Sequence, residues 1–304
     1  MQLTLGPVQF NWDPEVWRDF YFRIADEAPV DTVVTGEVVC SKRKPFLDKY
    51  LPDVLERLSR AGKKVYVGSL VLVTLERERR QTSDLMEQEE FPVEVNDLTC
   101  LVGTNGKPHS IGPFINTYNE ATAAYFVRNG ATRICLPPEL PLPSIEMITK
   151  AVPETEIEVF AFGRAPLAIS ARCYHARLHN LTKDNCQFVC DKDLDGLTVD
   201  TLDGEHFLAM NGVQTLSHSS VNLLNEAAAL EAMGVKALRL SPQTCDMVSV
   251  ARIFRDVLDG RSEPEEGTAA LQALWPEAVF TNGFAHGIPG SQWVAGKLAA
   301  QSGA

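Results

Sequence analysis

Two patterns of apolar residues alternate along the chain. In the first, apolar and β-branched residues follow one another without interruption, as in residues 32–39 and 64–73. Such runs predict strands that are buried on both faces. In the second, apolar residues recur every three or four positions, as in residues 47–58, where Gly62 then ends the pattern. That spacing predicts an amphipathic helix with a glycine at its C-terminal cap.

The alternation of these patterns continues over most of the chain. Strands are predicted at residues 3–10, 32–39, 64–73, 93–95, 110–114, 133–136, 157–162 and 237–240. Helices are predicted at residues 13–27, 47–58, 76–90, 119–129, 144–151, 219–233 and 248–258. Repeated strand–helix units with short turns indicate an α/β protein with a parallel sheet. Their number favours a TIM-barrel-like (β/α) barrel, irregular or incomplete, over an open sheet.

One insertion and one tail depart from this regularity. Residues around 170–210 are strand-like and polar, and we expect them to form an insertion in a barrel-like domain that spans residues 1–260. Residues 261–304 predict a C-terminal helix and a Gly-rich closing loop of the same domain, with 263–267 as a solvated linker before that helix.

Composition narrows the possible partners and the compartment. The chain of 304 residues has 28 basic and 40 acidic residues, a formal net charge of −12. Proteins that bind nucleic acid normally have a basic excess, so no nucleic-acid partner is expected. The N-terminus lacks the pattern of a secretory signal, and no apolar run reaches the roughly 18–20 residues of a transmembrane segment. Seven cysteines in such a chain predict a cytoplasmic protein whose clustered cysteines bind metal.

The stretch of residues 170–190 concentrates the candidate chemistry. It contains Cys173, Cys186 and Cys190 among basic and polar side chains. Positive neighbours or a metal stabilise the thiolate, which is the form that ligates. A fourth cysteine, Cys40, follows the strand predicted at 32–39 and precedes a basic run, although it could also be an ordinary buried thiol. In α/β barrels this end of the strands holds the active site.

The identity of the metal stays open on spacing alone. Structural zinc sites favour pairs of cysteines two to four residues apart, and only Cys186 and Cys190 form such a pair. Ligands scattered along an enzyme fold favour an iron–sulfur cluster, and the absence of any metal is a third alternative. Cys100 and Cys135 lie in apolar segments and are expected in the core, whereas Cys245 is ambiguous.

Three segments identify a family resemblance: residues 36–43, residues 170–177 with Cys186 and Cys190, and residues 282–293. Together they closely resemble the UbiV type of the collagenase-like peptidase family, a branch that acts in oxygen-independent ubiquinone biosynthesis. The likeness covers essentially the whole chain.

The resemblance implies a cofactor and several partners. It implies that Cys40, Cys173, Cys186 and Cys190 bind one [4Fe-4S] cluster. It implies a heterodimer with a UbiU-type protein, a lipid-binding accessory protein, and anaerobic hydroxylation of a ubiquinone precursor with prephenate as the hydroxyl donor. Peptidase activity is not expected, since no nucleophile–base arrangement is apparent.

Residues beside the predicted ligands are candidates for a supporting role. Glu37, Arg43, Arg172 and His175 flank the cysteines and could tune a cluster or bind an anionic donor. No catalytic residue is assigned. Two alternative functions stay open: hydroxylation of RNA bases, which the charge of −12 disfavours, and a scaffold in which a cluster holds a partner interface.

Overall fold

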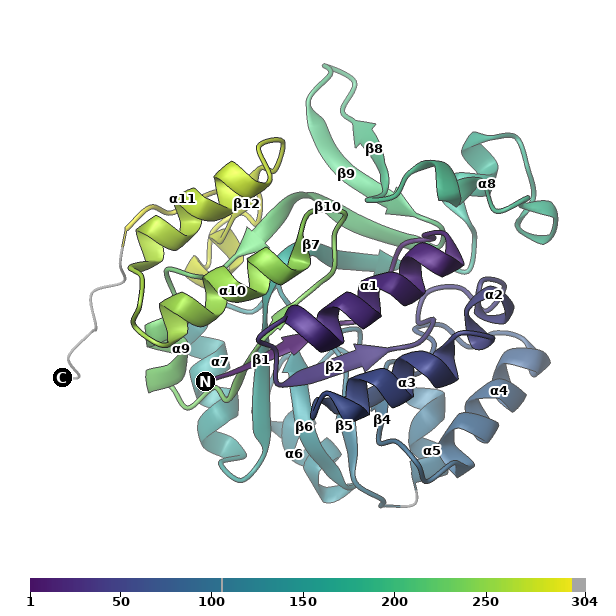
Figure 1. Cartoon of the computed structure of the whole chain (residues 1–304), viewed down its shortest axis with the longest axis horizontal. Coiled ribbons are helices and arrows are strands. Elements are labelled where there is room, and N and C mark those ends of the chain that lie inside the picture. The colour runs from purple at the N-terminus through teal and green to yellow at the C-terminus, as the bar shows by residue number, and fades with distance from the viewer. Residues whose placement is uncertain (105, 297–304) are drawn as a thin grey trace.

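The strands of the protein close into a parallel barrel. In the computed structural model, which describes residues 1–104 and 106–296, each barrel strand pairs in parallel with the next and the last pairs with the first. The eight strands are β1 (Gln2–Leu5), β2 (Thr32–Thr35), β3 (Lys64–Gly68), β4 (Val93–Val95), β5 (His109–Ile111), β6 (Ala131–Leu136), β7 (Glu156–Ile169) and β11 (Ala237–Leu240). The predicted barrel class is confirmed (Figure 1).

Helices surround this barrel. They are α1 (Pro14–Glu27), α2 (Lys44–Asp48), α3 (Leu51–Arg60), α4 (Glu76–Glu87), α5 (Leu101–Thr104), α6 (Glu120–Arg128), α7 (Leu142–Ala151), α9 (Ala227–Ala232), α10 (Met247–Leu258) and α11 (Pro264–Leu274). Helix α1 shows how the sequence fixes such an element. The Asp13 side chain accepts hydrogen bonds from two backbone N–H groups of the first turn, and Trp17, Tyr21 and Ile24 are buried on its inner side.

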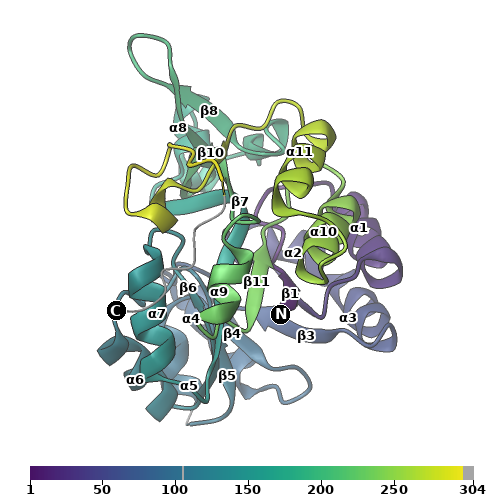
Figure 2. The ribbon, with the colours of Figure 1, turned by 90° about the vertical axis from the view of Figure 1, so that its left-hand side faces the viewer.

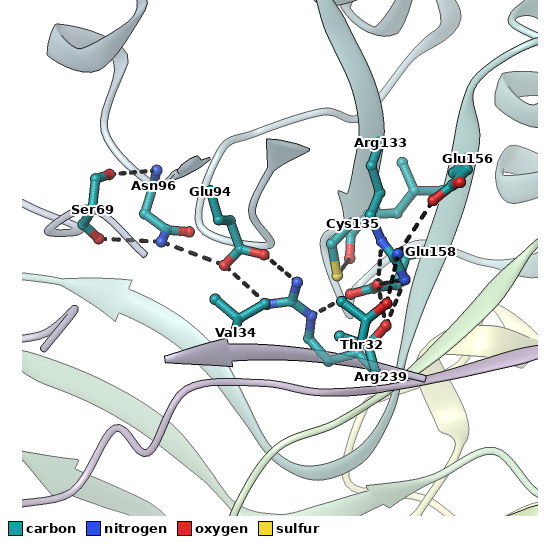
Figure 3. Close-up of polar contacts among 12 residues, drawn as sticks. Thr32, Val34, Ser69, Glu94, Asn96, Arg133, Cys135, Glu156, Glu158 and Arg239 are labelled. Atoms are coloured by element: carbon teal, nitrogen blue, oxygen red, sulfur yellow. Dashed lines mark hydrogen bonds and ion pairs between the residues drawn. The ribbon is translucent and has the colours of Figure 1, made fainter. Parts of the chain in front are cut away.

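Alternate residues of the barrel strands face two different environments. The outward residues are apolar and pack with the helices in one core, as Ile134 and Leu136 of β6 do. The inward residues include a network of buried charges, shown in Figure 3. Arg133 and Arg239 both bind the carboxylate of Glu158, and Arg239 also binds Glu94. All four side chains are almost fully buried, so the barrel interior is held by paired charges.

Beyond the barrel, β7 continues into the insertion. Its outer half pairs antiparallel with β10 (Gln214–Asn222), which pairs in turn with β9 (His206–Asn211), and β8 (Leu197–Asp200) completes this ribbon. Strand β12 (Phe280–Thr281) pairs with the other end of β10. The β8–β9 hairpin and α8 (Tyr174–Leu178) lie at one end of the barrel (Figures 1 and 2).

Gly163 permits this change of direction. Its φ of +107° lies in the left-handed region, and a Cβ atom there would come within 2.8 Å of the Ser241 carbonyl oxygen. A larger residue would therefore clash with the chain that follows β11, and only glycine allows β7 to pass so close to it.

Several local predictions were wrong. The strands predicted at 3–10, 64–73 and 110–114 end earlier, at Leu5, Gly68 and Ile111. The predicted helix 219–233 is β10 as far as Asn222, and only α9 is helical, because pairing with β7 and β12 overrides local helix propensity. The strand predicted at 32–39 ends at Thr35, since Gly36 turns the chain with a φ of +103°. The expected linker at 263–267 is the capped first turn of α11. The predicted C-terminal region 261–304 extends beyond the described residues, which end at 296.

Among the described residues, no helix has the length and apolar character needed to cross a membrane.

Candidate metal centre

Four cysteines from distant parts of the sequence line one cavity. Cys40 comes from the loop after β2, Cys173 precedes α8, and Cys186 and Cys190 lie in the loop that follows α8. The cavity that they line is small, with a volume of about 20 Å³. Among the described residues, no three His, Cys, Asp or Glu side chains are grouped closely enough for a single metal ion.

The loop between Cys186 and Cys190 has an unusual backbone. Gln187 and Phe188 have φ values of 48° and 55°, in the left-handed region that residues other than glycine seldom adopt. Phe188 packs edge-on against Phe46 of α2, with ring centroids 4.9 Å apart. Such strain persists where surrounding contacts fix the chain, and the residues on either side of it, Cys186 and Cys190, line the same cavity.

Arg43 is a buried cation that lines the same cavity as these thiols. Its side chain is 2% exposed, and its guanidinium donates to the Gln9 carbonyl oxygen at 2.8 Å and to Asn211 Oδ1 at 3.0 Å. Among the described residues, no carboxylate forms an ion pair with Arg43, and its Nε has no hydrogen-bond partner. The charge of Glu37 is the largest single contribution that opposes the cost of burying Arg43, and the thiols of Cys190 and Cys40 follow it.

The electrostatics of these thiols depend on that arginine. Burial raises the pKa of Cys40 and Cys190, and the charge of Arg43 opposes the rise at both. Without a metal, these two cysteines are therefore neutral thiols near neutral pH. A bound metal cation would deprotonate them, and Arg43 would then stabilise the thiolates.

Glu37 fixes the backbone around the first cysteine. Its Oε1 accepts hydrogen bonds from the backbone N–H groups of Val39 at 2.7 Å and Cys40 at 2.8 Å. Burial raises the pKa of Glu37, and Arg43 opposes this rise. Glu37 lines a neighbouring hollow and is not part of the cysteine cavity. Its role in the structure is to position the Cys40 loop.

His175 lines the cysteine cavity and is buried at 1% exposure. The Gly212 N–H donates to its Nδ1 at 2.9 Å, so the ring proton must lie on Nε2, which faces Asp193 Oδ2 at 3.0 Å. Burial lowers the pKa of His175, in agreement with a neutral ring. His179, four residues further on, is exposed where α8 ends.

Some of the remaining residues singled out from the sequence line the cysteine cavity, and others do not. Arg172 is exposed and does not line the cavity, whereas Lys42 and Lys183 do. Cys100 and Cys135 are buried, as predicted for core residues, and Cys245 is half-buried in a different cavity. Sequence reasoning missed Gln9 and Asn211, which hold Arg43, because neither lies near a cysteine in the chain.

The fold and this site define an α/β-barrel protein with a four-cysteine centre at the carboxyl end of its barrel strands. A family model for peptidase family U32 matches residues 20–295, so the chain belongs to that family. This confirms the predicted relation to collagenase-like peptidases at the level of the family.

A curated relative and two solved structures are also similar. The tRNA hydroxylation protein P of Escherichia coli is 43% identical over 58 residues, a match that covers 19% of this chain and only 13% of that protein. Dihydropteroate synthase from Thermus thermophilus has a TM-score of 0.38 at 13% identity, over 90% of this chain and 94% of that one. A glycoside hydrolase family 5 enzyme from Prevotella bryantii has a TM-score of 0.41 at 7% identity, over 90% and 95% of the two chains. The barrel assignment rests on the strand pairing, not on these two likenesses.

Proposed function

We propose that this protein is an iron–sulfur component of a hydroxylation system that works without dioxygen. The observation that supports this most directly is the environment of Arg43: a fully buried guanidinium without a carboxylate ion-pair partner among the described residues, in the cavity lined by four converging cysteines. A buried charge without a direct ion pair is costly, and Glu37 compensates it only in part because burial raises the pKa of that carboxyl, so a further negative group is expected there. Thiolates bound to a cluster would supply it.

The chain's own residues fit a cluster in their chemistry. Cys40, Cys173, Cys186 and Cys190 would be its ligands, Glu37 would hold the Cys40 loop, and Arg43 would offset the charge of the thiolates. A cluster bound by four protein thiolates supplies electron transfer, because none of its irons is left open to act as a Lewis acid. The strained turn at Gln187 and Phe188 would limit how far the ligands can move.

Iron and sulfide analysis after anaerobic purification tests the cofactor. About four irons and four sulfides per chain are expected. Single Cys→Ala variants at the four cavity positions should lose most of both. Cys135→Ala is the matched control, because that thiol is buried inside the barrel, away from the cavity, and should leave the iron content unchanged. Zinc in place of iron, or equal loss in the control, would overturn the proposal.

Within the family, we infer that the chain acts in ubiquinone biosynthesis with a UbiU-type partner and a lipid-binding accessory protein, and that prephenate is the hydroxyl donor. The support is the resemblance of the segments around the cysteines to UbiV-type proteins. Co-purification with a UbiU-type protein, followed by anaerobic conversion of a ubiquinone precursor with added prephenate, tests this. Conversion that does not change when the cluster is reduced and reoxidised would instead favour a scaffold.

The similarity to a tRNA hydroxylation protein favours RNA as a second candidate substrate. The formal charge of −12 opposes it, because contacts with phosphates need a surplus of Lys and Arg. Titration of the protein with tRNA at increasing salt concentration tests whether RNA is a substrate. Binding that weakens steeply with salt would support RNA, and no measurable binding at low salt would exclude it as a direct substrate.

A further inference from the structure

A second cavity lies at the carboxyl end of the barrel strands, apart from the four cysteines of the candidate metal centre. Its volume is about 510 Å³. Arg164 from the extension of β7, His218 from β10 and Thr244 from the chain after β11 form part of its wall, and the segment between α11 and β12 closes the other side. This is the end of the barrel where α/β-barrel proteins bind their ligands, and the volume suits a small organic molecule.

Arg164 is the unusual group in this wall. Its Nη1 donates to the backbone carbonyl oxygens of Ser217, at 3.1 Å, and of His218, which fixes the guanidinium in place. Among the described residues, neither Nε nor Nη2 has an acceptor, and no carboxylate forms an ion pair with it. Burial lowers the pKa of Arg164, and the charge of Asp195 opposes this only in part.

Neither carboxylate of the cavity forms an ion pair with Arg164, although the charge of Asp195 compensates it in part. Both oxygens of Asp195 accept hydrogen bonds from Thr244, one from its N–H at 2.8 Å and one from its hydroxyl group. Glu277 is exposed at the rim. Since a half-buried cation is costly unless it is paired, an anion from outside the chain would compensate Arg164.

The rest of the wall indicates the kind of anion. Leu274, Trp275 and Val279 present apolar surface to the cavity. Because Nε is buried and Nη1 is engaged, only Nη2 of Arg164 can donate to a ligand, which suits one carboxylate oxygen, whereas a phosphate dianion would need further cationic or backbone donors. We propose that this cavity binds a small organic acid, with its carboxylate against Arg164 and its apolar body against Trp275 and Leu274.

A short segment connects this cavity with the candidate metal centre. Asp193 faces His175 in the cysteine cavity, and Asp195, two residues further on, is anchored to Thr244 in the second cavity. Between them, the Leu194 carbonyl oxygen accepts a hydrogen bond from Trp12 Nε1 at 2.9 Å. The binding site is therefore separate from the cysteines but attached to the same loop. The inference goes beyond the proposed function and does not need a cluster to be bound.

Ligand-observed NMR titration with benzoate as the probe tests the site, with benzamide as its neutral counterpart. We expect benzoate to bind the wild-type protein and benzamide to bind at least tenfold more weakly. Arg164→Met should weaken benzoate binding at least tenfold. Arg79→Met, which removes an exposed arginine of α4, is the matched control and should bind as the wild type does.

Two further variants keep the result interpretable. Val279 is 52% exposed, so Val279→Trp should fold while its ring fills the cavity and abolishes binding even if Arg164→Met does not fold. Cys173→Ser should bind benzoate normally, which separates this inference from the proposed cluster. Equal affinity for benzoate and benzamide, or unchanged affinity in a folded Arg164→Met or Val279→Trp variant, would overturn the proposal.

Discussion

Buried arginines occupy two contrasting regions of this barrel. In the interior, Arg133 and Arg239 are paired with the carboxylates of Glu158 and Glu94, which lie on other strands (Figure 3). At the carboxyl end of the strands, Arg43 and Arg164 have no carboxylate ion-pair partner among the described residues. The same side chain is thus neutralised by the protein itself in one region and left without a directly bound counter-charge in the other.

This difference separates structure from function. A charge network whose members satisfy one another needs no ligand, so its loss should affect folding. A buried cation whose counter-charge comes from thiolates or from an outside anion contributes little to stability by itself. Its loss should therefore affect binding more than folding. The predictions below test whether the two regions respond in these two ways.

Breaking the interior network should have the largest effect on stability. Glu158→Gln leaves two buried guanidinium groups without their shared carboxylate, and we expect it to lower the free energy of unfolding by about 3–5 kcal/mol. Urea denaturation followed by circular dichroism measures this. Asp26→Asn, which removes the partner of exposed Arg57, is the control and should change stability little. A small effect of Glu158→Gln would mean that the interior pairs do not hold the barrel together.

Replacing Arg43 at the carboxyl end of the barrel strands should instead lower the amount of metal bound. Arg43→Met should lower the iron content per chain at least twofold, because the thiolates lose their compensating charge, and Arg43→Lys should restore part of it. Iron analysis after anaerobic reconstitution, with circular dichroism as a check on folding, gives the result. Arg172→Ala is the matched control: this exposed arginine does not line the cavity, so the iron content should be unchanged. If a variant of Arg43 retains full iron, the charge argument fails.

Lowering the pH should weaken the interior network, because Glu158 becomes protonated. Burial alone would raise the pKa of Glu158, but Arg133 and Arg239 outweigh it and lower the pKa to about 2 from 4.5. Because the folded state holds this proton less tightly than the unfolded state does, the stabilisation is complete above about pH 4.5 and is lost as the pH falls toward 2. Denaturation curves between pH 5 and pH 2.5 should show a steeper loss of stability for the wild type than for Glu158→Gln. Parallel slopes would contradict the assignment.

Relieving the strained turn at the metal centre should have the smallest effect. Gln187 is exposed and has a left-handed backbone, so Gln187→Gly should stabilise the apo protein by about 1 kcal/mol or less. Thermal unfolding measures the change. A substantial destabilisation would show that the Gln187 side chain makes a contact that outweighs the backbone strain.

Much of the framework could be predicted from the sequence because it depends on local patterns. Strand β4 at Val93–Val95 and strand β11 at Ala237–Leu240 were predicted at their observed bounds, and helix α1 begins directly after the capping residue Asp13. The helix predicted at 219–233 failed because its first residues pair with distant strands. Pairing partners of this kind lie too far away in the chain for periodicity to indicate them.

The candidate site also combines features that the sequence alone predicts with features that depend on the tertiary structure. The sequence by itself determined the alternating elements, the acidic balance and the four cysteines with the basic residues beside them, since these are properties of composition and short-range spacing. Only the tertiary structure brought Cys40 beside Cys190, paired Arg133 and Arg239 with Glu158, and left Arg164 without a direct carboxylate ion pair. Charge compensation is decided by the distance between side chains in space, and barrel closure sets these distances between strands far apart in the chain.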